Sequence, residues 1–165
     1  KGLLRLATKG HEIAVPTDVF KDPVVMEFLG LPESPRIVES RLEEALINFG
    51  GDVFALGPRA NGEPWVVGID DPNASGHACV RAVSLHRGGL ATSGDARRFL
   101  QKDNERYGHI LNPKTGWPVR GAPRSVSVKA ASCIDAGMLA TFAMLKGPDA
   151  EDFLQAEGAE HFIIW

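Results

Sequence analysis

The sequence has few of the features that assign a protein directly to a structural class. Its 165 residues include only two cysteines, Cys79 and Cys133, which lie far apart and outside any CxxC pair. This spacing argues against a zinc ribbon or a disulfide framework. We expect two free thiols, each buried as a small apolar side chain.

Long apolar runs and excess positive charge are also missing. No run approaches the ~20 apolar residues that a membrane-spanning helix requires. No charged segment followed by an apolar one marks a secretory signal, so a cytoplasmic location is expected unless a signal preceding Lys1 has been removed. The formal net charge of −3 provides no basic surface for nucleic acid. The sequence therefore predicts neither a membrane segment nor a nucleic-acid partner.

What is present divides near residue 48 into two unlike parts. Residues 1–47 contain prolines at 16, 23, 32 and 35, which break the segment into short pieces. Leu42, Ala45 and Leu46 recur at helical spacing, which predicts an amphipathic helix from Glu39 to Ile47. We therefore expect a helical lead-in over residues 1–47 and a main domain over 48–165.

The second part alternates strand-like and helical patterns without a regular βαβ repeat, which favours an α+β fold. An Asn-Gly pair at 61–62 predicts a hairpin over residues 52–69. The stretch 95–108 is expected to begin as a helix, and Gly147-Pro148 is expected to end a longer helix over 134–145. The remaining elements expected are strands at 78–86, 88–94, 125–131 and 161–165 and a short helix at 150–158.

Two glycine-containing stretches have the pattern of glycine and polar residues that is typical of a ligand site. Gly50 and Gly51 precede a predicted strand, where a backbone without side chains could approach a ligand; a tight turn is the simpler interpretation. Ser93, Gly94 and Asp95 end one predicted strand and open a predicted helix. Free N–H groups at such an end suit a phosphate, although capping of the helix explains the same residues.

The most informative stretch is "HILNPKTG", residues 109–116. A lone histidine such as His109 is more often structural, but here it precedes a proline-fixed turn. Asn112, Lys114, Thr115 and Gly116 place an amide, a cation, a hydroxyl and a glycine close together. These groups suit a diphosphate or a nucleotide.

Residues 48–147 resemble the C-terminal half of the ApbE-type FAD:protein FMN transferases. The stretches that carry the resemblance are, in order, "INFGGDVFALG", "PWVVGIDDP", "ATSGD", "HILNPKTGWPV", "SVSVKAASC" and "LATFAMLKG". The resemblance implies an ApbE-like fold, related to the T-fold, with a mixed sheet and packed helices. It also implies transfer of FMN from FAD to a threonine or serine hydroxyl of a target protein, with Mg²⁺ and release of AMP. It further implies a location in the bacterial periplasm or cell envelope.

Site roles follow from the same resemblance. His109 would act as the base that takes the hydroxyl proton or as a hydrogen-bond donor to a phosphate, roles that histidine commonly fills near neutral pH. The glycine-containing stretches and the 109–116 turn would form the wall around the flavin diphosphate. The family places a metal-binding aspartate four residues before its threonine, and here Thr141 matches the threonine while Gly137 stands at the aspartate position. Asp135 is the alternative carboxylate, but it lies about 200° around the helix from Gly137.

Residues 8–47 depart from that family and resemble the segment that leads into YhcG-type PD-(D/E)xK nuclease domains. The acidic and E-x-K elements of those nucleases do not follow in this sequence. Three functions therefore stand open: an FMN transferase, a non-catalytic flavin- or nucleotide-binding remnant, and an accessory module in DNA processing. Mg²⁺-stimulated transfer, flavin binding without turnover, and salt-sensitive DNA binding would distinguish them.

Overall fold

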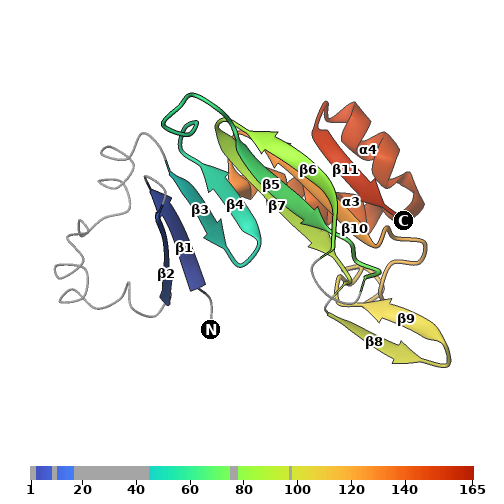
Figure 1. Ribbon diagram of the computed structural model, residues 1–165. Helices are drawn as coiled ribbons and strands as arrows, with labels where there is room; N and C mark the ends of the chain where they lie inside the picture. The colour runs from blue at the N-terminus through green and yellow to red at the C-terminus, as the bar shows by residue number, and fades with distance from the viewer. Residues whose placement is uncertain (1–2, 9–10, 17–44, 75–77, 97) are drawn as a thin grey trace.

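A seven-stranded antiparallel sheet forms the centre of the computed structural model, which describes residues 3–8, 11–16, 45–74, 78–96 and 98–165. Its strands lie in the order β11-β10-β7-β4-β3-β1-β2, and every neighbouring pair is antiparallel (Figure 1). Their bounds are β1 Leu3–Thr8, β2 His11–Pro16, β3 Leu46–Phe49, β4 Asp52–Ala55, β7 Gly88–Gly94, β10 Ser125–Ala130 and β11 Glu160–Ile164.

Two smaller hairpins and two helices complete the fold. The hairpins pair β5 (Trp65–Asp70) with β6 (Cys79–Leu85), and β8 (Phe99–Lys102) with β9 (Glu105–Gly108). Helix α3 (Cys133–Lys146) leads through a 3₁₀ turn, η2 (Gly147–Asp149), into α4 (Ala150–Ala156). The mixture of antiparallel strands and helices confirms the expected α+β class.

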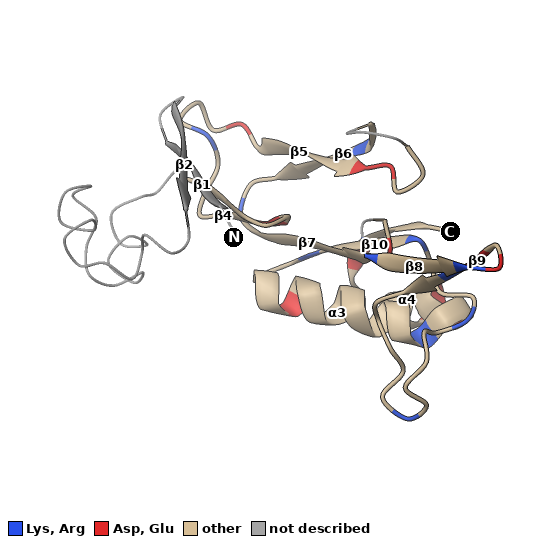
Figure 2. Cartoon of the chain, turned by 90° about the horizontal axis from the view of Figure 1, so that it is seen from below, with Lys and Arg blue, Asp and Glu red and all other residues tan. Residues whose placement is uncertain are grey.

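Side chains alternate between two apolar layers on either side of the central strands. Ala91 of β7 joins Val126 and Val128 of β10 under the buried alanines of α3. The neighbouring Leu90 faces the other way, into a cluster with Val53, Ala55 and Leu85. Figure 2 shows the consequence: the β5–β6 hairpin lies on one side of the sheet, and α3 and α4 on the other. This two-sided burial is the period-2 pattern of a strand with both faces covered.

The expected hairpin over residues 52–69 is wrong. β4 pairs with β3 and β7, whereas β5 pairs with β6. The Asn-Gly pair instead belongs to a longer loop, in which the Gly62 amide donates to the Arg59 carbonyl at 2.7 Å. The loop also places Asn61 Oδ1 as an acceptor for the Glu63 amide at 3.1 Å. Local turn chemistry was therefore present, but it did not determine which strands pair.

The helix expected to open at residue 95 is also absent, because β8 and β9 form a hairpin there. Its two-residue turn is Asp103-Asn104, with φ values of 52° and 61°. Positive φ at both central positions is the mark of a type I′ turn, which asparagine and aspartate tolerate well. The dipeptide was thus a hairpin signal inside a stretch interpreted as helical.

The N-terminal part differs from expectation where the structure describes it. Residues 3–8 and 11–16 are strands rather than part of a helical lead-in. Leu46 and Ile47 lie in β3, opposite Ala55 and Phe54 of β4, so the expected helix does not extend through them. Residues 39–44 of that expected helix lie outside the described residues. The predicted strands β7, β10 and β11 and the helices α3 and α4 are all present, and Gly147 is the C-cap of α3.

Gly89 sets the distance between β7 and the start of α3, which yields a test. A Cβ added at Gly89 would lie 2.5 Å from the Cys133 backbone nitrogen. We expect Gly89→Ala to destabilise the fold by roughly 1–3 kcal/mol, the usual cost of overpacking. Thermal or urea unfolding measures the loss.

Gly137→Ala is the matched control for this substitution. Its added Cβ would meet only the Ala91 Cβ at 3.8 Å, an ordinary contact, and alanine favours a helix interior. The control should be neutral or slightly stabilising. Equal stability of Gly89→Ala and the wild type would show that the close approach does not constrain the fold.

Candidate functional site

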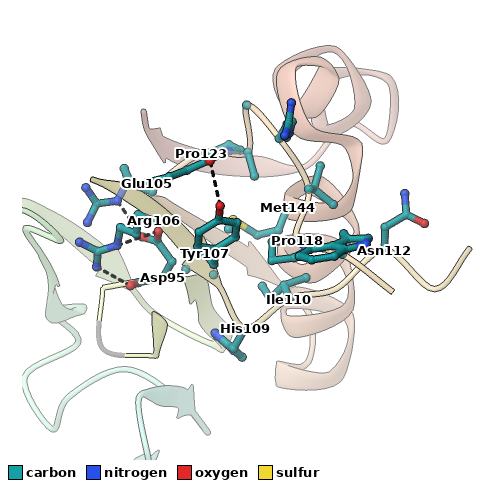
Figure 3. Close-up of a pocket in the computed structure, with 18 of the residues that line it drawn as sticks. Asp95, Glu105, Arg106, Tyr107, His109, Ile110, Asn112, Pro118, Pro123 and Met144 are labelled. Atoms are coloured by element: carbon teal, nitrogen blue, oxygen red, sulfur yellow. Dashed lines mark hydrogen bonds and ion pairs between the residues drawn. The ribbon is translucent and has the colours of Figure 1, made fainter. Parts of the chain in front are cut away.

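An open cleft of about 980 Å³ lies where β9 and the segment after it pass the ends of β7 and α3. Its walls come from the end of β7, from β9, from the loop that follows and from Met144 of α3 (Figure 3). Of the residues predicted from sequence, it brings together Gly94, Asp95, His109, Asn112 and Thr115. The cleft therefore joins two of the stretches singled out from the sequence, although some 15 to 20 residues separate them.

Asp95 is held between two arginines. Arg124 Nε donates to Asp95 Oδ1 at 2.7 Å, and Arg106 Nε lies 3.0 Å from Oδ2. The second contact is an ion pair without hydrogen-bond alignment, and Arg106 Nε has no hydrogen-bond partner. The carboxylate is only 13% exposed, so solvent screens these pairs weakly. The Asp95 carboxylate is thus paired with two arginine side chains and does not cap a helix.

Arg106 and Arg124 each link a further segment of the chain to Asp95. Arg106 Nη2 donates to the Asp95 carbonyl at 2.6 Å, and its guanidinium stacks over the Phe99 ring at 3.4 Å from the centroid. Arg124 Nη1 donates to Asn73 Oδ1 at 2.8 Å, in the loop between β5 and β6. The Asp95 cluster therefore fixes the β8–β9 hairpin and the β5–β6 loop to the end of β7.

His109 follows β9 with a defined tautomer. Its Nδ1 lies 3.1 Å from the Arg98 carbonyl oxygen. A carbonyl oxygen can only accept, so Nδ1 carries the hydrogen and the neutral ring keeps its lone pair on Nε2. The side chain is exposed, which leaves Nε2 open to a ligand in the cleft.

The turn after His109 is stabilised by its own polar groups. The Thr115 and Gly116 amides donate to the Asn112 carbonyl at 3.2 and 2.8 Å, and the Lys114 amide donates to Asn112 Oδ1 at 2.9 Å. The Thr115 hydroxyl accepts from the Trp117 amide at 3.3 Å. Gly116 has φ of 71°, which a residue with a side chain rarely adopts. Lys114 and Gly116 do not line the cleft; they shape the loop that carries Asn112 and Thr115 into it.

Gly50 and Gly51 form the tight turn between β3 and β4, with φ values of 69° and 113°. The Gly51 amide donates to Asn48 Oδ1 at 3.0 Å, and both glycines are exposed. They lie outside the cleft lining, so turn geometry accounts for them in the described part of the chain.

Ser93 and Thr141 meet between β7 and α3. Their hydroxyl oxygens are 2.9 Å apart and share a hydrogen bond. Neither lines the cleft, but Ser93 directly precedes Gly94, which does. Asp135 lies at the start of α3, where its amide donates to Oγ of the N-cap residue Ser132 at 3.1 Å. The Ser132 hydroxyl in turn donates to the Asp135 carboxylate at 2.7 Å.

These positions do not fit a divalent cation. Thr141 offers one neutral oxygen that is already hydrogen-bonded, and Gly137 has no side chain. The Asp135 carboxylate accepts a hydrogen bond from Ser132, the N-cap of α3. In the part of the chain that the structure describes, no group of three or more His, Cys, Asp or Glu side chains could hold a metal. Mg²⁺ generally needs at least one carboxylate beside its waters and phosphates, so we assign it no step.

The sequence interpretation missed much of the cleft. Arg106 could not be predicted as a cleft residue, because residues 95–108 are expected from the sequence to begin as a helix. The Asp103-Asn104 turn is the signal in this stretch for a hairpin instead. The Tyr107 hydroxyl donates to Glu105 at 2.9 Å, and this hydrogen bond is the main cause of a raised pKa for Tyr107. Arg120 lines the cleft with no carboxylate at ion-pair distance among the described residues. Arg120 therefore adds positive charge for an anionic ligand to that of the Asp95 cluster, and no spacing rule would have found it.

The two cysteines are free, but only one is even partly buried. Cys79 is exposed, so the expected burial is wrong there. Cys133 is half-buried, and its thiol donates to the Val53 carbonyl at 3.3 Å. Burial raises the pKa of the Cys133 thiol, and the nearby Asp52 carboxylate adds to the rise.

Among the helices of the described residues, none combines the length and the apolarity needed to cross a membrane.

The chain thus combines an antiparallel α+β fold with a cleft lined by a histidine and three arginines. Comparison with known proteins identifies the family. The model of the ApbE family matches residues 36–163, and the chain belongs to that family.

Two curated relatives and one solved structure illustrate the likeness. The FAD:protein FMN transferase of Haemophilus influenzae is 30% identical over 115 residues, 69% of this chain and 33% of that protein. The enzyme of the same name from Treponema pallidum is 38% identical over 114 residues, 64% of this chain and 32% of that protein. The ApbE protein of Thermotoga maritima superposes with a TM-score of 0.67 at 29% identity, covering 95% of this chain and 52% of that one. The chain thus spans about a third of the curated relatives that it matches.

The Asp95 cluster gives a second prediction. We expect Asp95→Asn to lower the free energy of unfolding by roughly 1–3 kcal/mol, because two guanidinium groups lose their shared counter-charge. Denaturant unfolding measures the loss.

Glu63→Gln serves as the control, because its pair with Arg59 is 4.0 Å long and both side chains are more than half exposed. It should cost well under about 1 kcal/mol. Similar losses for the two variants would mean that the Asp95 cluster behaves as an ordinary surface pair.

Proposed function

We propose that this chain binds FAD in the cleft and supports transfer of FMN to a threonine or serine hydroxyl of a target protein, with release of AMP. One observation carries the proposal: the cleft gathers His109, Asn112 and Thr115 beside Arg120. The matched relatives named FAD:protein FMN transferase support it, although the chain spans only part of their length.

The chemistry follows from charge and proton balance. The attacking hydroxyl oxygen forms a bond to the FMN-side phosphorus of the FAD diphosphate, and the bond from that phosphorus to the bridging oxygen breaks. The hydroxyl proton passes to His109 Nε2, which the hydrogen bond at Nδ1 leaves as the acceptor. AMP leaves with the bridging oxygen, and the Arg120 guanidinium lies in the cleft to offset the charge on the phosphates.

Non-catalytic flavin binding is the second candidate, and Gly137 favours it. The family resemblance places a metal-binding aspartate there, and the residues present do not replace it. Such a chain would hold FAD through the cleft without turnover. Incubation with FAD, Mg²⁺ and an acceptor protein, followed by mass spectrometry for an FMN adduct, separates the two candidates.

The cleft wall is tested by flavin affinity. His109→Ala and Thr115→Ala should each weaken FAD binding by roughly 0.5–1.5 kcal/mol, a few-fold to about tenfold in Kd, because each removes one polar contact. Both side chains are exposed on a turn, so unfolding midpoints should stay unchanged. Isothermal titration calorimetry measures the affinity.

Gln101→Ala, on β8 and outside the cleft lining, is the control for this experiment. It should bind FAD as the wild type does. Unchanged affinity in both cleft variants would remove the assigned role of the 109–116 turn.

The absence of an aspartate at position 137 gives a further prediction. Wild-type chain should bind Mg²⁺ poorly in the presence of FAD, and Gly137→Asp should improve binding, because it places a carboxylate one turn from Thr141. A Cβ at residue 137 would meet the Ala91 Cβ at 3.8 Å, an ordinary contact, so the first atom of the new side chain fits. Calorimetric titration with Mg²⁺ provides the measurement.

Gly137→Asn matches the aspartate in size without its charge and should bind no better than the wild type. Asp135→Asn tests the rival ligand. If the wild type bound Mg²⁺ well and Asp135→Asn abolished binding, the metal would belong to Asp135 instead.

A further inference from the structure

Glu105 places a negative charge in a cleft that otherwise carries positive charge. It lines the cleft at the start of β9, together with Asp95 and with Arg106, Arg120 and Arg124. Asp95 is paired with two of these arginines, whereas Glu105 has no lysine or arginine within 4.0 Å among the described residues. A carboxylate without a cation partner repels an anion that enters the cleft, so Glu105 weakens the binding of any phosphate there.

A hydrogen bond holds Glu105 in this position. The Tyr107 hydroxyl donates to Glu105 Oε2 at 2.9 Å, and a dashed line joins the two side chains in Figure 3. This hydrogen bond is the main cause of the raised pKa of Tyr107, and the positive charge of Arg120 acts against the rise. Glu105 and Arg120 therefore act on the same phenol, although they are not paired with each other. A phosphate bound by Arg120 lies within the field of the Glu105 carboxylate.

We propose that Glu105 is a specificity residue of the cleft, which favours dinucleotides such as FAD over nucleoside diphosphates and triphosphates; this role rests on the nucleotide binding proposed above. Each phosphate of the FAD diphosphate is esterified on both sides and carries a single negative charge. A terminal phosphate carries about 1.5 to 2 negative charges at pH 7, so ADP brings more charge to the same position and ATP more again. Repulsion grows with the charge of the ligand, which makes Glu105 the repulsive element that discriminates between them.

The size of the effect follows from the exposure of Glu105 to solvent. In water, two unit charges ~8 Å apart interact strongly enough to change an affinity roughly two- to threefold for each unit of ligand charge. Salt screens this interaction, because the Debye length falls to about 3 Å at 1 M ionic strength. Discrimination by Glu105 should therefore be largest at low salt.

Glu105→Gln tests the proposal, because it removes the charge and keeps an oxygen that can accept from Tyr107. Isothermal titration calorimetry measures Kd for FAD, ADP-ribose, ADP and ATP, in EDTA so that Mg²⁺ does not offset the phosphate charge. ADP-ribose has the two singly charged phosphates of FAD without the flavin ring, so its comparison with ADP isolates the terminal charge. We expect Glu105→Gln to gain roughly two- to threefold more affinity for ADP than for ADP-ribose, and more again for ATP. High salt should remove these differences.

Two further variants accompany this experiment. Glu63→Gln removes the same charge from the loop before β5, outside the cleft lining, and should leave all four affinities unchanged. Tyr107→Phe keeps the Glu105 carboxylate but removes the hydrogen bond that holds it. Its preference between ADP-ribose and ADP should lie between those of the wild type and Glu105→Gln. Circular dichroism checks that each variant keeps the wild-type fold.

The outcomes separate this role of Glu105 from the proposed function. Equal gains for ADP-ribose and ADP in Glu105→Gln, or no gain for either, in a chain that binds FAD would overturn the specificity role and leave the proposed function in place. A matching gain in Glu63→Gln would also overturn it, because the effect would then belong to the overall charge of the chain. Failure of all four nucleotides to bind either protein would overturn the proposed function and this role with it.

Discussion

The close contact between β7 and α3 is the constraint on which the other parts depend. It exists because residue 89 has no side chain: any Cβ there would overlap the backbone at the first residue of the helix. Ala91, two residues further along the same strand, then packs beneath the buried alanines of α3. Small residues on both partners keep the helix near the sheet, and this proximity lets the Ser93 and Thr141 hydroxyls meet at 2.9 Å.

The same strand ends at the cleft, so packing and chemistry are linked through a few residues. Asp95 follows β7 directly and gathers Arg106 and Arg124 from two other segments. Because Arg106 lies in β9, three residues before His109, the cluster also restrains the strand that leads into the histidine. Asp95 offsets only one of the two positive charges of this cluster, so Arg106 and Arg124 together keep a net positive charge at the cleft. Arg120, which lines the cleft without a carboxylate partner among the described residues, adds further positive charge for an incoming phosphate.

How much could be predicted from sequence depended on whether the signal was local. α3 was predictable because Gly147-Pro148 ends an unbroken apolar pattern, and β10 because "SVSVKA" alternates. Strand pairing was not predictable from local signals. The Asn-Gly pair after β4 predicts a hairpin with the next strand, but β4 pairs with β3 and β7 instead. For the site, residues within "HILNPKTG" were found because one turn holds them together. Arg120 and Arg124 were not predicted, because only tertiary structure brings them to the cleft.

Binding of a flavin nucleotide and transfer of FMN make different demands on the site. The cleft residues meet the demands of binding, whereas Gly137 leaves out the carboxylate that the family uses to hold a metal for transfer. Holding a diphosphate requires donors and a cation, which His109, Asn112 and Arg120 can supply without a metal. Transfer requires more, because charge that develops between the phosphorus and its leaving group must be stabilised where it appears. The described residues place no carboxylate beside Thr141 to hold Mg²⁺ there. The proposed transfer of FMN therefore requires that charge stabilisation at that point come from elsewhere, whereas the proposed binding of a flavin nucleotide does not.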